Sequence, residues 1–207
     1  MIKPFYSQFL TPTKKFRRLS VLLSVHDSPR ISQHRIGELT HLSSSMVNNY
    51  VKEFQAEGLL KVSGKTNRTQ SYHLTPRGRK ELISLLLDYS AEIIRLYTAA
   101  KHEVGERLDN LANEGIKTIG LFGAAETAEV VHAATKGTGI KVVAVVDSDP
   151  EKQGRAFNGL TIQAPEVLKE LDADALVITS FGKQQEIYQQ IKEIAGDTFR
   201  IIRLSDL

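Results

Sequence analysis

An almost unbroken helical pattern occupies the middle of the chain, from Thr75 to about Asn113. Only Gly78 and Gly105 weaken it. Apolar residues recur every three or four positions, at Leu82, Leu86, Tyr89, Ile93, Leu96, Ala100, Val104, Leu108 and Leu111. A helix of roughly 35 residues is longer than most globular helices, so it separates an N-terminal part from a C-terminal part.

The charge of the chain is divided between these two parts. Residues 1–80 hold 14 Lys and Arg against 4 Asp and Glu, a net charge of +10. Residues 81–207 hold 13 against 20, a net charge of −7, and the two values sum to +3. A basic N-terminal part favours a polyanionic partner, although a merely solvated basic face is the alternative.

The N-terminal part predicts three short helices and a hairpin. Apolar residues at helical spacing occupy three segments, residues 14–28, 32–40 and 43–57. Alternating apolar residues then predict two strands, residues 59–63 and 70–74. Ser32 and the cluster Ser43–Ser45 are placed to cap helices, and the basic loop 64–69 joins the strands. Three helices and a hairpin make a winged helix-turn-helix.

Four short motifs follow one another through this part of the chain. They are Ile36-Gly-Glu-Leu, Leu42-Ser-Ser-Ser-Met-Val, Glu57-Gly-Leu-Leu and Tyr72-His-Leu-Thr-Pro-Arg-Gly. Their order and spacing, over about residues 14–82, resemble winged-helix bacterial repressors, including the multiple-antibiotic-resistance regulator type. The resemblance implies a domain that binds double-stranded DNA.

The helix after the serine cluster carries side chains suited to the major groove. A recognition helix needs short hydrogen-bonding groups near its N-terminus, and Asn binds adenine through both amide atoms. We expect base contacts from Ser44, Ser45, Asn48 and Asn49. We expect phosphate contacts from Lys52, Lys61, Lys65 and Arg68. The alternative is a simple helix cap followed by a soluble turn.

The spacing in the long helix is close to a coiled-coil seam. We expect this seam to join two protomers, because paired winged helices read the two half-sites of a near-palindrome. The alternative is that the seam packs against the chain's own C-terminal domain, as two shorter helices broken near Gly105.

From Lys117 onward, apolar strands alternate with helices. We expect strands at residues 118–122, 141–147, 160–163, 175–180 and 200–204. We expect a helix that follows the segment Gly123–Ala128 and ends at about Thr135, and two more helices at residues 165–171 and 184–195. The predicted fold class is therefore an α+β winged helix domain, a long helix and an α/β Rossmann-like parallel sheet of about five strands.

The turn after the first of these strands is the expected ligand site, because such sheets bind ligands at the carboxyl ends of their strands. Gly123–Ala128 follows the dinucleotide pattern G-x-G-x-x-G/A except for Ala125 at the second glycine. Asp147 ends the second strand, where an acid bonds a ribose hydroxyl. The expected effector site is Gly123, Ala124, Ala125, Glu126, Thr127, Asp147, Ser148, Thr179 and Ser180. The alternative is a plain turn with a solvated aspartate.

Four longer segments continue this pattern. They are Phe122-Gly-Ala-Ala-Glu, Val145-Val-Asp-Ser-Asp-Pro-Glu-Lys-Gln-Gly, Gly159-Leu-Thr-Ile-Gln-Ala-Pro-Glu-Val-Leu and Asp174-Ala-Leu-Val-Ile-Thr-Ser. Their order resembles the Rossmann-like half-domain of nucleotide-sugar epimerases, dehydratases and sugar acyltransferases. The layout of the chain is also similar to redox-sensing repressors that read NADH against NAD. Ala125 departs from the NAD pattern, so the resemblance implies a nucleotide sugar in preference to NAD(H).

Other chemistries have little support. The chain has no cysteine, and its six histidines lack metal spacing. Tyr188 and Lys192 match Y-x-x-x-K, but they follow the glycine turn too closely for a short-chain dehydrogenase. No apolar run approaches the roughly 20 residues of a membrane helix, and the start lacks the apolar core of a signal peptide. We expect a cytoplasmic protein that is not an enzyme and binds no metal or membrane.

These observations predict four segments: an arm, a winged helix DNA-binding domain, a dimerisation helix and a nucleotide-sensing domain, at residues 1–13, 14–78, 79–114 and 115–207. The hypothesis is a homodimeric transcriptional regulator. Two alternatives are a small nucleotide-dependent enzyme with an accessory basic domain, and a DNA-binding dimer with a ligand-free Rossmann module.

Overall fold

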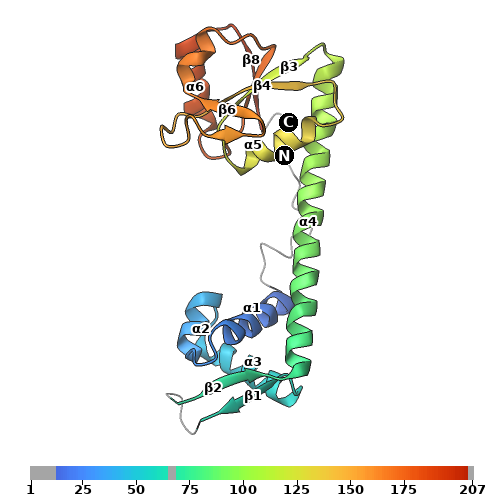
Figure 1. The fold of residues 1–207 in the computed structure, drawn as a ribbon, viewed down its shortest axis with the longest axis vertical. Helices are drawn as coiled ribbons and strands as arrows, with labels where there is room; N and C mark the ends of the chain where they lie inside the picture. The colour runs from blue at the N-terminus through green and yellow to red at the C-terminus, as the bar shows by residue number, and fades with distance from the viewer. Residues whose placement is uncertain (1–12, 65–68, 205–207) are drawn as a thin grey trace. The chain divides into compact units, whose positions relative to one another are not determined.

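The computed structural model describes residues 13–64 and 69–204. The chain forms two compact units that divide within one helix, between Ile94 and Arg95 (Figure 1). Each unit has its own hydrophobic core.

Three helices and a hairpin build the N-terminal unit. They are α1 (Lys14–Asp27), α2 (Gln33–Thr40), α3 (Ser44–Ala56), β1 (Leu60–Ser63) and β2 (Ser71–Leu74). The side-chain oxygens of Thr13, Ser32 and Ser43 each accept a backbone N–H in the first turn of the helix that follows. These caps fix where the helices begin. The predicted winged helix-turn-helix architecture is confirmed.

The three helices share one core. It contains fully buried side chains from each of them: Val21, Leu22, Ile36, Val47 and Phe54. The hairpin is antiparallel, with Leu60 opposite Leu74 and Ser63 opposite Ser71. The N–H of Tyr72 donates to the carbonyl of Pro29 at 2.7 Å, so β2 lies against the turn between α1 and α2.

The long helix, α4 (Pro76–Asn113), is continuous over 38 residues, without a break at Gly105. Thr75 caps it by accepting the N–H of Gly78 on its hydroxyl oxygen at 3.0 Å. The same hydroxyl donates to the carbonyl of Gly58 at 2.8 Å. One residue therefore ties the start of α4 to the end of α3.

The apolar seam of α4 does not face a single partner. Leu82 is buried in the N-terminal core, whereas Val104, Leu108 and Leu111 are buried in the C-terminal unit. Ile93, in the middle of the seam, is exposed. Both ends of the seam therefore pack into hydrophobic cores of the same chain. The spacing of apolar residues alone does not distinguish this arrangement from a seam between two protomers.

The C-terminal unit is built on a sheet of six strands. They are β3 (Thr118–Phe122), β4 (Lys141–Val146), β5 (Ala156–Phe157), β6 (Leu160–Gln163), β7 (Ala175–Ile178) and β8 (Arg200–Arg203). Their order is β5-β6-β4-β3-β7-β8. All neighbouring pairs are parallel except β5 with β6. The expectation of a wholly parallel sheet is therefore wrong at one edge.

Two local differences from the predicted elements have physical causes. Strand β5 has only two residues, too few to show a period, and the left-handed pair Asn158 and Gly159 turns it into β6. The segment expected as a helix at 165–171 is a 3-10 helix, η1 (Pro165–Lys169), because its bonds run over three residues, as from Val167 to Ala164.

Helices cover both faces of this sheet (Figure 1). The last turns of α4 and helix α5 (Glu126–Thr135) pack on the face that carries Ile119 and Leu121. Helix α6 (Gln184–Ala195) and η1 pack on the face that carries Phe122 and Ile178. The carboxyl ends of β3, β4 and β7 are thereby left at one edge between the helix layers. Within the described residues, we find no helix with the length and hydropathy of a membrane span.

Candidate functional site

Helix α3, the predicted recognition helix, has one face in the core and one in solvent. Val47, Tyr50, Val51 and Phe54 form the buried face. Ser45, Asn49 and Lys52 follow at intervals of four and three, and all three are exposed. This spacing places them on one side of the helix, opposite the core. The side chains of Asn49 and Lys52 make no hydrogen bond or ion pair within the described residues.

The other predicted base-contacting residues lie beside this face. Ser44 is exposed in the first turn, and Asn48 is half-buried on a flank. Ser43 is the cap, because its hydroxyl oxygen accepts the N–H of Met46 at 3.3 Å. The hydroxyl of Ser45 lies 2.9 Å from that of Ser43.

Two of the predicted phosphate-contacting residues lie in the hairpin loop, and the structure describes the strands of the hairpin and the two ends of that loop. Lys61 is exposed on β1, and the hydroxyls of Ser63 and Ser71 bond across the two strands at 2.6 Å. Lys65 and Arg68 lie outside the described residues, so their predicted phosphate contacts stay predictions.

Arg18 anchors α3 to α1, a role that the sequence did not reveal. Its guanidinium bonds Glu53 at 2.5 Å and Glu57 at 2.6 Å, and it lies over the ring of Phe54. Hydrogen bonding to Glu57 is the main reason that the pKa of Arg18 is raised, and the same bond lowers the pKa of Glu57. The Arg18 side chain is only 14% exposed, so this pairing joins α1 firmly to the last turns of α3.

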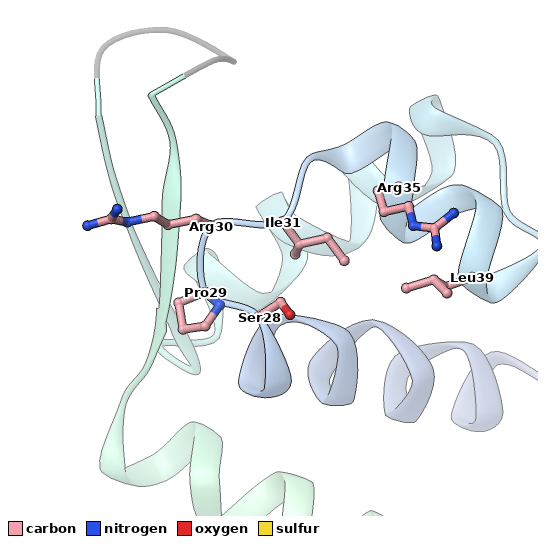
Figure 2. A pocket seen from close by; sticks show the side chains of 6 residues that line it. All are labelled: Ser28, Pro29, Arg30, Ile31, Arg35 and Leu39. Atoms are coloured by element: carbon pink, nitrogen blue, oxygen red, sulfur yellow. The ribbon is translucent and has the colours of Figure 1, made fainter.

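An open groove of about 710 Å³ lies between the turn after α1 and helix α2 (Figure 2). Its lining consists of Ser28, Pro29, Arg30, Ile31, Arg35 and Leu39. Arg35 pairs with Glu38 at 2.9 Å, while the side chain of Arg30 points away from the groove. Neither arginine was expected in the DNA-contacting set, because no motif distinguishes them from the other basic residues.

The turn after β3 is tightly bonded to its neighbours in the sheet. Gly123 has a positive φ of 110°, which favours glycine, and its N–H donates to the carbonyl of Val146 at 2.7 Å. Thr179 is buried, and its hydroxyl contacts the carbonyls of Phe122 and Gly123 at 2.9 and 2.6 Å. Gly123 and Thr179 thus meet at the carboxyl ends of β3 and β7.

Asp147 joins the same turn to the end of β4. Its carboxylate accepts the N–H of Ala124 at 2.7 Å, the N–H of Asp149 at 2.9 Å and the ammonium of Lys152 at 3.0 Å. Burial tends to raise the pKa of Asp147, but the two backbone N–H groups and Lys152 outweigh it and hold the pKa below its ordinary value. The aspartate is therefore buried and bonded rather than solvated.

The remaining predicted effector residues fall into two groups. Ser148 donates to Gln190 at 2.8 Å, and Ser180 accepts the N–H of Lys183 at 3.3 Å. Ala125, Glu126 and Thr127 open α5, where Ala125 supplies no side-chain cap. The acidic Glu126 in this first turn opposes binding of an anion at the amides of the helix end.

Two further expectations concern catalysis and metals. Lys192 pairs with Asp197, and its ammonium lies 5.7 Å from the ring centre of Tyr188, with Arg203 also over that ring. Both members of the Y-x-x-x-K pair thus have structural contacts. Among residues 13–64 and 69–204, no cluster of three or more His, Cys, Asp or Glu could hold a metal ion.

Two family models match the chain, one in each unit. Residues 17–61 match the winged helix-turn-helix DNA-binding model, and residues 115–202 match the model described as C2185-like, N-terminal. No curated protein matches the chain. The N-terminal unit is thus a winged helix-turn-helix by both its structure and its sequence.

Solved structures match part of the chain at low similarity. A Listeria innocua protein of unknown function is 26% identical, with a TM-score of 0.35, over 40% of this chain and 58% of its own. A MarR family regulator from Silicibacter pomeroyi is 22% identical, with a TM-score of 0.36, over 44% and 65%. A Mycobacterium tuberculosis MarR family protein, solved with p-aminosalicylic acid, is 18% identical, with a TM-score of 0.35, over 38% and 61%. The chain therefore spans less than two thirds of each of these proteins.

Proposed function

We propose that this protein is a cytoplasmic, DNA-binding transcriptional regulator and not an enzyme. The observation that carries the proposal is the exposed side of α3, where Ser45, Asn49 and Lys52 lie opposite the core. Short polar groups on a recognition helix reach base edges, and a lysine binds phosphate. The net charge of +10 over residues 1–80 supports the same partner.

The proposed contacts divide into two kinds. Ser44, Ser45, Asn48 and Asn49 read bases, with Asn49 the best placed because it is exposed on the outward side. Lys52 and Lys61, together with Lys65 and Arg68, bind phosphates without sequence preference. The protein acts as a homodimer joined through the long helix, so that two recognition helices read two half-sites.

We further propose that the C-terminal unit is a Rossmann-like sensor of a nucleotide-type effector, with a nucleotide sugar preferred over NAD(H). Its five parallel strands have the order β6-β4-β3-β7-β8, which corresponds to five of the six strands of the classic doubly wound sheet. Ligands of such sheets bind where the strand order reverses, which here is at the carboxyl ends of β3 and β7. The predicted residues Gly123–Thr127, Asp147, Ser148, Thr179 and Ser180 lie at the carboxyl ends of the central strands.

A second candidate is a DNA-binding dimer whose C-terminal unit takes no ligand. The bonds that Asp147 makes to Ala124, Asp149 and Lys152 favour this candidate, because they use the carboxylate within the fold. An effector changes DNA affinity only if it binds two arrangements of the protein differently, so a unit without a ligand would not regulate.

Selection of duplexes from a random pool tests the DNA-binding proposal. We expect an enriched sequence, with affinity that falls steeply with salt, and Lys61→Ala should reduce the slope of log K against log salt by about 0.9. Thermal melting with NAD, NADH and UDP- and GDP-sugars tests the sensor, because a ligand of the folded state raises the midpoint. No enriched duplex would overturn the first proposal, and no midpoint shift would favour the ligand-free candidate.

A further inference from the structure

Exposed apolar side chains are concentrated on one helix. Of the nine large apolar residues that are exposed within the described part of the chain, six lie on α4 between Ile83 and Tyr97. Ile83 is 57% exposed, Leu87 65%, Ile94 64% and Tyr97 44%. An exposed apolar surface of this kind typically marks an interaction site.

The spacing of these residues defines a stripe distinct from the predicted seam. Ile83, Leu87, Ser90, Ile94 and Tyr97 follow at intervals of four, three, four and three, the heptad alternation of a two-helix contact. The stripe is offset by one residue from Leu82, which faces the core of its own unit. We call these five residues the α4 stripe.

We infer that the α4 stripe binds the same stripe of a second copy of this chain, with the two helices antiparallel. The inference deepens the proposed pairing of protomers and does not depend on DNA. In this register Leu87 packs against Tyr97 of the second copy, and Ser90 packs against Ile94. The small residues Ser90 and Ala91 lie near the centre, where they allow close approach of the two backbones.

Charge complementarity favours the antiparallel direction. Asp88 and Arg95 lie seven residues apart on one edge of the stripe, with small residues beside them at Ser84, Ala91 and Thr98. In the antiparallel register, Asp88 of one copy and Arg95 of the other are offset along the helix axis by one residue, about 1.5 Å. In a parallel, in-register pair they are seven residues apart, about 10 Å.

The existing partner of Asp88 is compatible with this arrangement. Lys15 bonds Asp88 through Oδ2 within the same chain, and Asp88 remains half exposed, at 55% of its side chain. A carboxylate accepts several hydrogen bonds, so Oδ1 can accept a guanidinium from the second copy. Two such pairs, related by the two-fold axis, flank the stripe.

Disulfide formation gives a direct test, because the natural chain has no cysteine. Full-length Leu87→Cys and Tyr97→Cys variants, carrying different affinity tags, are oxidised alone and as a mixture without DNA. We expect a disulfide-linked dimer from the mixture and none from either variant alone. Self-linking of each single variant would overturn the antiparallel register in favour of a parallel one.

A charge variant tests self-association itself. Leu87→Lys places an ammonium in the stripe and should weaken the dimer by at least about tenfold in sedimentation experiments, since that charge has no partner there. Ala99→Lys, on the opposite, exposed side of α4, is the matched control and should keep the mass at twice 23.0 kDa. A monomeric natural protein that gives no cross-link would overturn the inference.

One outcome identifies a different occupant of the stripe. If the protein is monomeric and Leu87→Lys lowers its thermal midpoint, the stripe is covered by the chain itself, and the inference fails. The proposed function is tested separately, because monomeric Leu87→Lys should still bind a single half-site, more weakly than the dimer binds two. Loss of all DNA binding in the natural protein would count against the proposed function and not against the stripe.

Discussion

The outward side of α3 and the carboxyl ends of β3, β4 and β7 both carry polar side chains that were predicted to bind a partner, yet the two surfaces differ in how those side chains are used. On α3, the side chains of Asn49 and Lys52 are exposed and make no hydrogen bond or ion pair within the described residues. At the strand ends, Asp147 and Thr179 are buried and already bonded. Exposed groups are available to a partner, whereas buried and bonded groups contribute first to stability.

The largest effect should come from the residue that holds α3 in place. Arg18→Met removes the main partner of Glu53 and Glu57, so we expect a loss of about 2–3 kcal/mol in unfolding free energy, between the values for an exposed and a buried ion pair. Urea unfolding measures it. Lys15→Met, which removes an exposed pair with Asp88, should cost less than about 1 kcal/mol. Equal losses in the two variants would show that Arg18 has no special anchoring role.

Asp147→Asn should produce the next largest effect. The amide has the size of the carboxylate, but its NH2 group would face the backbone N–H of Ala124 or Asp149, so that one hydrogen bond is lost. We expect this loss to lower the unfolding free energy by about 1–3 kcal/mol. Thermal melting should show a lower midpoint for this variant, with Ser148→Ala as the control. An unchanged midpoint, together with lost ligand binding, would make Asp147 a ligand residue and remove the contrast between the two surfaces.

Asn49→Ala should change DNA recognition and leave stability almost unchanged. If Asn49 reads a base, discrimination between the preferred duplex and one altered at that base should fall by about 1–3 kcal/mol. Fluorescence anisotropy measures both affinities. Gln55→Ala, exposed in the last turn of α3, should retain full discrimination. The same discrimination in Asn49→Ala and the natural protein would place the base contacts elsewhere.

The smallest predicted effect is on how the stability contributed by Asp147 depends on pH. Because the pKa of Asp147 is lowered in the folded protein, its contribution to stability is complete above the ordinary carboxyl value of about 3.9. The contribution is lost as the pH falls through the lower, folded value. The difference in midpoint between the natural protein and Asp147→Asn should therefore be constant from pH 7 to about pH 5 and narrow below about pH 4. A difference that widens in acid would contradict the assigned bonds.

Local signals predicted most of the elements. Ser32, Ser43 and Thr75 were recognisable as caps because a cap acts within one helical turn, and the structure confirms each of them. Strands β3 and β4 were recognisable from their continuous apolar residues. These features depend on a few neighbouring residues, which are present in the sequence itself.

Features that depend on distant partners were not predictable. The role of Arg18 requires Glu53 and Glu57, more than 30 positions along the chain, to lie on a neighbouring helix. The bond from Ala124 to Asp147 joins two strands, so the sequence left open whether the aspartate is solvated. The sequence also left open which partner the seam of α4 contacts, since Leu82 and Leu108 face different cores.

The order of strands in the C-terminal sheet has a consequence for protein synthesis. Strand β3 leaves the ribosome first, but one of its two neighbours, β7, follows more than 50 residues later, and β8 comes after that. The N-terminal unit, in contrast, is closed by contacts among residues that are made early. A chain that terminates after α4 therefore contains the complete winged helix without its sheet. Under the proposed function, such a product would keep the DNA-binding surface of α3 and lack the proposed sensor.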